Sequence, residues 1–468
     1  RDPAARKRYR KQPGRGSREQ SGMEQLRREG PRIFFRFHNG APSYHGRVSR
    51  PLAAVLTLGC KLNLADSEAI ARSLREAGYD VVDSLCDADA YVVNTCSVTH
   101  VADQKSRKLI RSVRRMAPAA RVAVAGCFPR TAGFEAVRAL GADRVVGTGD
   151  SDMADLVRFF IPAATGMSST TAAAGLHTRA FIKAQEGCND VCAFCIVPRT
   201  RGREVSRPIQ RVVGEVARVV REGAREVVIT GTQLGAWGRD FDAALKPHHL
   251  MAALVEQTEA ARIRLSSLQP QDITPELLAL WQDPRLMPHF HLALQSGSDA
   301  TLAAMRRRYN AREFVQAAER IRAAVPAVAI TTDVIAGFPG ETEADFEATM
   351  ALCRDVGFAR LHCFPYSRRS RTAAARMPDQ VSDALRRERM ERLLALGADL
   401  SRRFRGAARG QVRPVLWEEE RTLGGRRYWH GLTDNYIPVY SEGAALGNRL
   451  TPVVLGDVYH DGVLAEPM

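Results

Sequence analysis

Three cysteines lie within one short loop, at positions 188, 192 and 195. Their C-x3-C-x2-C spacing lets three thiolates of one loop converge, as iron–sulfur and zinc sites require. A structural zinc site has four protein ligands, and no histidine follows this loop until His248. The pattern therefore predicts a metal site with one open coordination position, where a substrate or cofactor binds. Two alternatives stay open: three small buried core residues, or a zinc site completed from elsewhere in the chain.

A second set of three cysteines, Cys60, Cys96 and Cys127, ends three apolar runs. The runs 52–58, 91–96 and 121–127 indicate buried strands, and their alternation with helical patterns favours a parallel sheet. Because the carboxyl ends of parallel strands meet at one edge, we expect a second three-thiolate site there. The alternative is three separate core residues. Cys86 lies between the predicted elements and is expected to be structural.

The chain as a whole is predicted to be of the α/β class. The predicted parts are, in chain order, a basic disordered segment 1–50, an α/β domain 51–160, a linker 161–178, a central βα domain 179–400, and a small β-barrel 401–468. Within the first domain, Asp66 or Ser67 is expected to cap a helix with Ile70 and Leu74 on its apolar face.

The central region alternates strand and helix about six times. Pro208 and an apolar stripe predict a helix that Gly223 ends. Six βα units suggest a closed or partial barrel, and the cysteine loop follows its first strand, so the site lies at the carboxyl ends of the strands. Cys353 and Cys363 are expected in the core. The strand candidates are 180–184, 226–230, 263–268, 289–295, 328–335 and 358–364.

The end of the chain is rich in short β runs. After a charged helix over 382–405, four runs predict the small barrel: 412–417, 427–429, 436–440 and 450–454.

The net charge of +16 is uneven, because residues 1–50 hold 14 Lys or Arg and only 4 Asp or Glu. A basic arm that contacts RNA is the alternative to simple disorder there. No apolar run approaches the roughly 20 residues of a membrane helix. Without a leader pattern, a cytoplasmic protein with reduced cysteines and no membrane partner is expected.

The loop 185–198 and the string 201–207 resemble the radical S-adenosylmethionine enzymes, and within them the methylthiotransferases. This resemblance implies a partial (β/α)6 barrel in which Cys188, Cys192 and Cys195 hold a [4Fe-4S] cluster that binds S-adenosylmethionine. The strings around Cys60, Cys96 and Cys127 are similar to the amino-terminal domain of that family, and imply an auxiliary [4Fe-4S] cluster. The string 431–436 resembles the RNA-binding TRAM domain.

The resemblance also implies further residues. Gln295 and Asp333 correspond to segments that line the S-adenosylmethionine pocket. The arginines 306–308 face either phosphate or solvent. Arg371 stands where the family usually has glycine, which puts the geometry of that loop in question. No side-chain acid or base is predicted to be catalytic, because the chemistry belongs to the clusters.

The strings Lys61–Asn63 and Thr433–Tyr436 look most like the subgroup that adds a methylthio group at C2 of N6-threonylcarbamoyladenosine 37 in tRNA. The alternatives are N6-isopentenyladenosine 37 or an aspartate of ribosomal protein S12 as substrate. From a different class, the chain could be a non-catalytic iron–sulfur protein that binds RNA. The implied partners are the tRNA anticodon loop and an electron donor of the flavodoxin or ferredoxin type.

Overall fold

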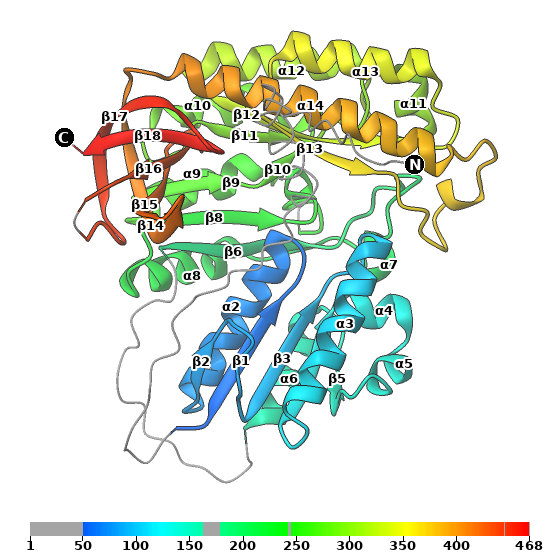
Figure 1. The fold of residues 1–468 in the computed structure, drawn as a ribbon, viewed down its shortest axis with the longest axis vertical. Helices are drawn as coiled ribbons and strands as arrows, with labels where there is room; N and C mark the ends of the chain where they lie inside the picture. The colour runs from blue at the N-terminus through cyan, green and yellow to red at the C-terminus, as the bar shows by residue number, and fades with distance from the viewer. Residues whose placement is uncertain (1–49, 162–177, 242–244, 444, 468) are drawn as a thin grey trace, which may run out of the picture. The chain divides into compact units, whose positions relative to one another are not determined.

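The computed structural model describes residues 50–161, 178–241, 245–443 and 445–467 (Figure 1). The predicted basic segment, apart from Arg50, and nearly all of the predicted linker lie outside the described residues.

The amino-terminal part is a five-stranded parallel sheet in the order β2-β1-β3-β4-β5. Alternate residues of its strands are buried on opposite faces: Ala53 and Val55 pack in one core cluster, Ala54 and Leu56 in the other. A sheet covered by helices on both faces is the predicted α/β architecture. The strands are β1 (Leu52–Thr57), β2 (Asp80–Val82), β3 (Ala90–Thr95), β4 (Arg121–Gly126) and β5 (Arg144–Val145), and the helices are α2 (Lys61–Glu76), α3 (His100–Met116), α4 (Cys127–Ala132), α5 (Phe134–Arg138) and α6 (Asp150–Phe160).

The predicted start of the first helix was wrong. Helix α2 begins at Lys61, directly after Cys60, so Asp66 and Ser67 lie inside it and not at its cap. Both side chains are buried and have tertiary partners: the Asp66 carboxylate pairs with Lys183, and Ser67 Oγ accepts from Asn94 Nδ2. These contacts explain why two polar residues lie inside a helix. The local sequence pattern does not contain this explanation. The apolar face with Ile70 and Leu74 is confirmed.

The central part is an open barrel built from two sheets, β7-β6-β8-β9 and β10-β11-β12-β13. All strand pairs in it are parallel except β6 with the short edge strand β7. The predicted partial (β/α)6 architecture is confirmed in this part. The strands are β6 (Arg179–Glu186), β7 (Val205–Ser206), β8 (Glu226–Gly231), β9 (Arg262–Leu265), β10 (Ser267–Leu268), β11 (His289–Leu292), β12 (Ala329–Ala336) and β13 (Arg360–Pro365), and the helices are α7 (Val197–Thr200), α8 (Ile209–Arg221), α9 (Pro247–Gln257), α10 (Pro275–Ala279), α11 (Asp299–Ala304), α12 (Ala311–Ala324) and α13 (Glu343–Val356).

Two of the predicted strands differ in detail. The run 263–268 is split between β9 and β10, and the run 289–295 forms a strand only to Leu292. Gln295 has a φ of 69° and makes only an isolated bridge to Val334. A left-handed residue cannot continue an extended strand, so the chain turns there.

The carboxy-terminal part is helix α14 (Asp383–Ala407) followed by a closed barrel in the order β14-β15-β16-β18-β17. Its core contains Val415, Trp417 and Val439. The predicted small barrel is confirmed, with a fifth strand that the sequence analysis missed. The strands are β14 (Val412–Leu423), β15 (Arg426–Thr433), β16 (Pro438–Ser441), β17 (Leu450–Tyr459) and β18 (Gly462–Pro467). In the described part of the chain, none of the helices combines the length and apolar character that crossing a bilayer demands.

Candidate metal centres

The loop with Cys188, Cys192 and Cys195 follows strand β6, at the carboxyl end of the barrel strands, as predicted. The three side chains are half-buried and line one open hollow of about 500 Å³. Five arginines share this hollow with them: Arg199, Arg203, Arg306, Arg371 and Arg376. Thiols beside cationic side chains suit a ligand that carries negative charge.

Each of the three sulfur atoms in this loop accepts a hydrogen bond. The backbone N–H of Asp190 donates to Cys188 Sγ at 3.3 Å, and that of Val197 donates to Cys195 Sγ at 3.4 Å. Arg307 Nη1 donates to Cys192 Sγ at 3.2 Å. Donors of this kind stabilise thiolates and tune the reduction potential of a cluster that the thiolates hold.

Arg307 is a site residue that the sequence analysis did not identify. The arginines 306–308 were expected to face phosphate or solvent, but Arg307 turns into the site and also donates to Gln269 Oε1 at 3.1 Å and to Tyr309 Oη at 3.0 Å. Its exposed neighbour Arg308 pairs with Asp190 at 2.9 Å. The only sequence signal was the Arg-Arg-Arg-Tyr string, which does not say which arginine is buried.

Burial raises the pKa of the Cys188 thiol to about 11 and that of Cys195 to about 12. These thiols are protonated at neutral pH unless a metal replaces the proton. In the ranges that the structure describes, no three Cys, His, Asp or Glu side chains converge closely enough to hold one metal ion. An iron–sulfur cluster binds each thiolate at a different iron, so the donor set fits a cluster better than a single zinc ion.

The second set of cysteines is brought together at one edge of the amino-terminal sheet. Cys60 caps helix α2, Cys96 directly follows β3, and Cys127 is the first residue of α4. Burial, together with the nearby Cys127 and Cys60, raises the pKa of Cys96 to about 12. The three strand ends therefore bring the three cysteines to one edge of the sheet, and their use as one cluster site stays a prediction.

Two close approaches fix this arrangement. A Cβ atom on Gly59, whose φ is +116°, would lie 2.8 Å from Cys96 Cβ, so only glycine lets the Cys60 loop come this near. Asn63 Nδ2 donates to the carbonyls of Leu58 at 2.7 Å and Thr95 at 3.0 Å, which joins the ends of β1 and β3.

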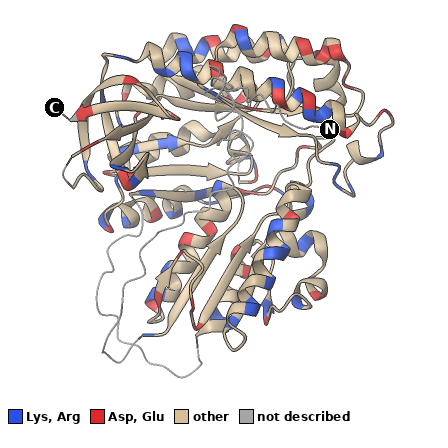
Figure 2. Cartoon of the chain, in the orientation of Figure 1, with Lys and Arg blue, Asp and Glu red and all other residues tan. Residues whose placement is uncertain are grey.

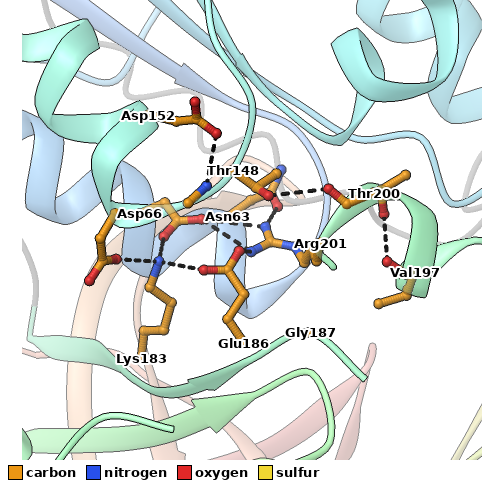
Figure 3. A network of polar contacts seen from close by, with 12 residues as sticks. Asn63, Asp66, Thr148, Asp152, Lys183, Glu186, Gly187, Val197, Thr200 and Arg201 are labelled. Carbon is orange, nitrogen blue, oxygen red and sulfur yellow. Dashed lines mark hydrogen bonds and ion pairs between the residues drawn. The ribbon is translucent and has the colours of Figure 1, made fainter. Parts of the chain in front are cut away.

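A buried polar network joins helix α2, which begins directly after Cys60, to strand β6 and to Arg201 of the central part (Figure 3). Arg201, which follows α7 in the cysteine loop region, donates to Asp66 at 3.3 Å, to Glu186 at 2.7 Å and to Asn63 Oδ1 at 2.5 Å. Lys183 of β6 donates to the same Asp66 at 2.6 Å. Sequence reasoning missed this network, because its members come from α2, β6 and the region after α7.

Arg201 also lies beside the thiol of Cys127. Burial alone would disfavour its charge, but Cys127 and Asp66 outweigh this effect and hold the pKa of Arg201 well above its ordinary value. In return, burial raises the pKa of Cys127, and the Arg201 guanidinium opposes that rise. A permanent cation therefore stands next to one of the amino-terminal thiols.

The remaining predicted residues are placed as follows. The backbone N–H of Gln295 donates to the Asp333 carbonyl at 2.8 Å, while the Asp333 carboxylate pairs with His291 at 3.3 Å. Arg371 has a φ of 71°, the left-handed conformation that glycine favours, and its carbonyl accepts from Arg199 Nε at 3.1 Å. Cys353 and Cys363 are core residues, as expected, and Cys86 is half-buried between elements.

Two protein-family models match the chain. Residues 53–147 match the uncharacterized protein family UPF0004, and residues 182–353 match the radical SAM superfamily. The first range covers all three amino-terminal cysteines, and the second covers the cysteine loop of the barrel.

Curated relatives match over most of the chain. The threonylcarbamoyladenosine tRNA methylthiotransferase MtaB of Bacillus subtilis (strain 168) is 37% identical over 407 residues, which cover 83% of this chain and 89% of that protein. MtaB of Thermotoga maritima is 34% identical, covering 84% and 91%. The tRNA-2-methylthio-N(6)-dimethylallyladenosine synthase of Syntrophotalea carbinolica is 33% identical, covering 88% and 98%.

Among solved structures, the radical S-adenosylmethionine methyltransferase TsrM from Kitasatospora setae is similar in fold. The TM-score is 0.50 at 15% sequence identity, with 68% of this chain and 73% of that chain covered. At this identity the likeness concerns the fold alone.

Proposed function

The chain belongs to the radical S-adenosylmethionine methylthiotransferase family, and on that premise we propose that it adds a methylthio group to N6-threonylcarbamoyladenosine in tRNA. The observation that carries the proposal is the pair of three-cysteine sites at the carboxyl ends of two parallel sheets. Relatives named for this substrate at 37% and 34% identity support the choice of nucleoside.

As a member of this family the enzyme uses an iron–sulfur cluster and S-adenosylmethionine. The number and placement of clusters belong to the proposal: Cys188, Cys192 and Cys195 hold the [4Fe-4S] cluster that binds S-adenosylmethionine, and Cys60, Cys96 and Cys127 hold an auxiliary [4Fe-4S] cluster. Cys188, Cys192 and Cys195 would hold a cluster whose chemistry is one-electron reduction of S-adenosylmethionine, which would give methionine and a radical able to react with an inert C–H bond. Gln295 and Asp333 are proposed to line the S-adenosylmethionine pocket.

The residues around the clusters have definable tasks. Arg307 and the backbone N–H groups of Asp190 and Val197 hold the loop thiols in place and stabilise their negative charge. Arg201 places a cation beside Cys127 and ties the two sites together through Asp66. A fixed spacing between the sites serves a reaction that uses both on one base.

The surface charges support a polyanionic substrate. Lys and Arg positions recur along helix α3 (Figure 2). Four of them are exposed and form a stripe that borders a shallow groove together with Gln104 and Ser112: Arg107, Lys108, Arg111 and Arg115. None of the four forms an ion pair with a described residue. The stripe and the arginines of the cysteine hollow suit contacts with the phosphates of the tRNA anticodon arm.

The rest of the assignment follows the family order. We propose residues 51–160 as the auxiliary-cluster domain, 179–400 as the radical S-adenosylmethionine barrel and 401–468 as a TRAM-like RNA-binding barrel. We also propose an external electron donor of the flavodoxin or ferredoxin type, and a cytoplasmic location, which is where a tRNA substrate is found.

The test combines metal analysis with product analysis. Iron and sulfide are measured anaerobically, with EPR, and the enzyme is then incubated with reductant, S-adenosylmethionine and bulk tRNA, whose nucleosides are read by mass spectrometry. We expect about eight irons per chain and a methylthio product on threonylcarbamoyladenosine. The same product on isopentenyladenosine would move the substrate, and four irons that all disappear in C188A would contradict the auxiliary cluster.

A further inference from the structure

The segment 366–377, which follows strand β13, contacts the cysteine loop of the barrel. The backbone N–H of Ala374 donates to the carbonyl of Ala193, in the middle of that loop, at 2.8 Å. The Arg371 carbonyl accepts from Arg199 Nε, just beyond the loop, at 3.1 Å. Ala193 and Ala374 also belong to one buried apolar cluster. This segment, the strap, is therefore held against the loop site by hydrogen bonds and by packing.

One arginine of the strap, Arg369, reaches into the amino-terminal part of the chain. Its Nη1 donates to Asp103 Oδ2 of helix α3 at 2.8 Å, and its Nη2 donates to Ser97 Oγ at 2.9 Å. Ser97 Oγ donates in turn to Asp103 Oδ1 at 2.6 Å, which closes a triangle of hydrogen bonds. All three residues are buried. A buried arginine–carboxylate pair of this kind keeps one geometry, because a displacement leaves a charge without its partner.

The contacts of Arg369 lead to two of the amino-terminal cysteines. Ser97 directly follows Cys96 at the end of strand β3. Ser97 Oγ also lies 2.5 Å from Thr131 Oγ1 in α4, the helix that begins at Cys127. Through Ser97, Arg369 is therefore linked to both of the elements that carry these cysteines.

Further hydrogen bonds brace the strap between its two ends. At the start of α3, the backbone N–H of His100 donates to Ser367 Oγ at 3.2 Å, and His100 Nε2 donates to the Arg368 carbonyl at 2.6 Å. Thr372 Oγ1 donates to the Arg369 carbonyl at 2.8 Å. A segment that is hydrogen-bonded in this way transmits a displacement from one end to the other.

The strap is a second connection between the amino-terminal part and the barrel. The first is the buried network of Asp66 in α2 with Lys183 and Arg201. Helices α2 and α3 cover opposite faces of the amino-terminal sheet, since Ile70 and Ile110 belong to different core clusters. One connection would let the two parts swing about it, whereas connections at both faces fix their relative orientation.

We propose that Arg369 is a positioning residue that sets the distance between the two cysteine sites, so that both act on the same base. The inference rests on the proposed function. Cleavage of S-adenosylmethionine requires only the loop site, whereas methylthio transfer requires both sites at one spacing. Loss of Arg369 should therefore separate these two activities, and loss of an arginine that only stabilises the fold should not.

The experiment measures the distance between the two parts and the coupling of the two activities. Nitroxide labels are attached through a keto amino acid, which spares the nine native cysteines, at the exposed positions Ala136 in α5 and Gln316 in α12. Double electron–electron resonance gives the distribution of label distances in the cluster-loaded full chain, with its clusters in the diamagnetic oxidised state. The ratio of 5′-deoxyadenosine to methylthio nucleoside is measured with reductant, S-adenosylmethionine and saturating tRNA.

The variants are R369Q, R369K and D103N, with R114Q as the matched control. Arg114 makes a comparable set of contacts, which includes the Gly141 carbonyl and the Asp143 carboxylate, but all of them lie inside the amino-terminal part. Thermal denaturation and iron content show for each variant whether the fold and the clusters are kept.

We expect R369Q and D103N to broaden the distance distribution, because parts of a chain move relative to each other where the contacts between them are lost. Formation of the methylthio nucleoside should fall roughly ten- to a hundredfold, while formation of 5′-deoxyadenosine should fall less than about threefold. R369K should restore part of both properties, since an ammonium still pairs with Asp103 but lacks the planar fork that also reaches Ser97. R114Q should melt at a lower temperature and keep the distances and the product ratio of the unsubstituted enzyme.

The label distances and the product ratio can each overturn the proposal. An unchanged distance distribution in R369Q and D103N would show that Arg369 does not set the spacing. Equal losses of both products in R369Q would leave Arg369 a role in stability only. If R369Q does not fold, R369K and D103N are compared with R114Q in its place. Absence of methylthio product from the unsubstituted enzyme would overturn the proposed function, and the label distances would still decide the role of Arg369.

Discussion

The two cysteine sites are built in different ways. Cys188, Cys192 and Cys195 belong to one loop, are half-buried and border an open hollow. Cys60, Cys96 and Cys127 belong to three separate strand ends, and the last two are buried. The loop site depends on local spacing, whereas the amino-terminal site exists only when the parallel sheet has formed. Formation of the loop site is therefore coupled weakly to folding, whereas formation of the amino-terminal site is coupled strongly to it.

The largest effect is expected from the cysteines themselves. C188A and C127A should each abolish the methylthio product and remove about half of the iron. The metal-free proteins should differ, because C127A removes a buried sulfur and lowers the free energy of unfolding by about 1 kcal/mol, whereas C188A leaves it nearly unchanged. Denaturant unfolding, metal analysis and nucleoside mass spectrometry measure the three quantities. C86A serves as control and should keep iron and activity; equal unfolding free energies for C188A and C127A would remove the proposed contrast.

Removing the shared carboxylate of the buried polar network should have nearly as large an effect. D66N takes the shared carboxylate from Lys183 and Arg201, whose side chains are only 4% and 2% exposed. Leaving two buried cations short of a partner should lower the free energy of unfolding by about 3 kcal/mol. Urea denaturation measures it against D155N, which breaks the more exposed pair with Arg144 and should cost less than about 1 kcal/mol. Similar losses in both variants would mean that the network does not anchor the amino-terminal site.

A moderate effect is expected from the charged stripe that follows the Cys96 strand end. R111Q/R115Q removes two exposed cations of α3 and should weaken tRNA binding by roughly tenfold at physiological salt. The slope of log affinity against log salt should become shallower by roughly one to two units, while the iron content stays constant. The matched pair R312Q/R320Q changes two exposed arginines of α12. Equal losses of affinity in both pairs would show that α3 has no special role.

The smallest effect concerns the loop site. Arg371 borders the cysteine hollow in a left-handed conformation, so R371G relieves backbone strain. Since glycine also gains freedom in the unfolded chain, the net gain in the free energy of unfolding should be only about 0.5 kcal/mol. Arg376, in the short helix η4 (Ala374–Arg376), is the control, since R376G should destabilise by a similar amount. Thermal denaturation measures the stability of both variants. A loss of stability in R371G would show that the backbone of Arg371 is not strained.

Much of the fold followed from local patterns, and the errors have identifiable causes. Apolar runs that end in Cys60, Cys96 and Cys127 predicted three strands and their common edge, because parallel strands align their carboxyl ends. The start of α2 was predicted several residues too late, because Asp66 is a good cap by propensity but is used by Lys183 in the folded chain. The strand predicted over 289–295 is shorter in the structure, because Gln295 has a left-handed backbone conformation that its residue type does not indicate.

Features that depend on neighbouring residues could be predicted before the fold was known: the spacing of the loop cysteines, the alternation of strand and helix, and the family resemblance of those strings. Which charged residues contact one another became visible only in the folded chain. Arg307 reaches Cys192, Arg201 joins Asp66 to Glu186, and Arg179 donates to Tyr436, in each case across separate elements. The physical reason is that buried charges take their partners from whichever segments packing brings together, and a linear pattern does not contain that information.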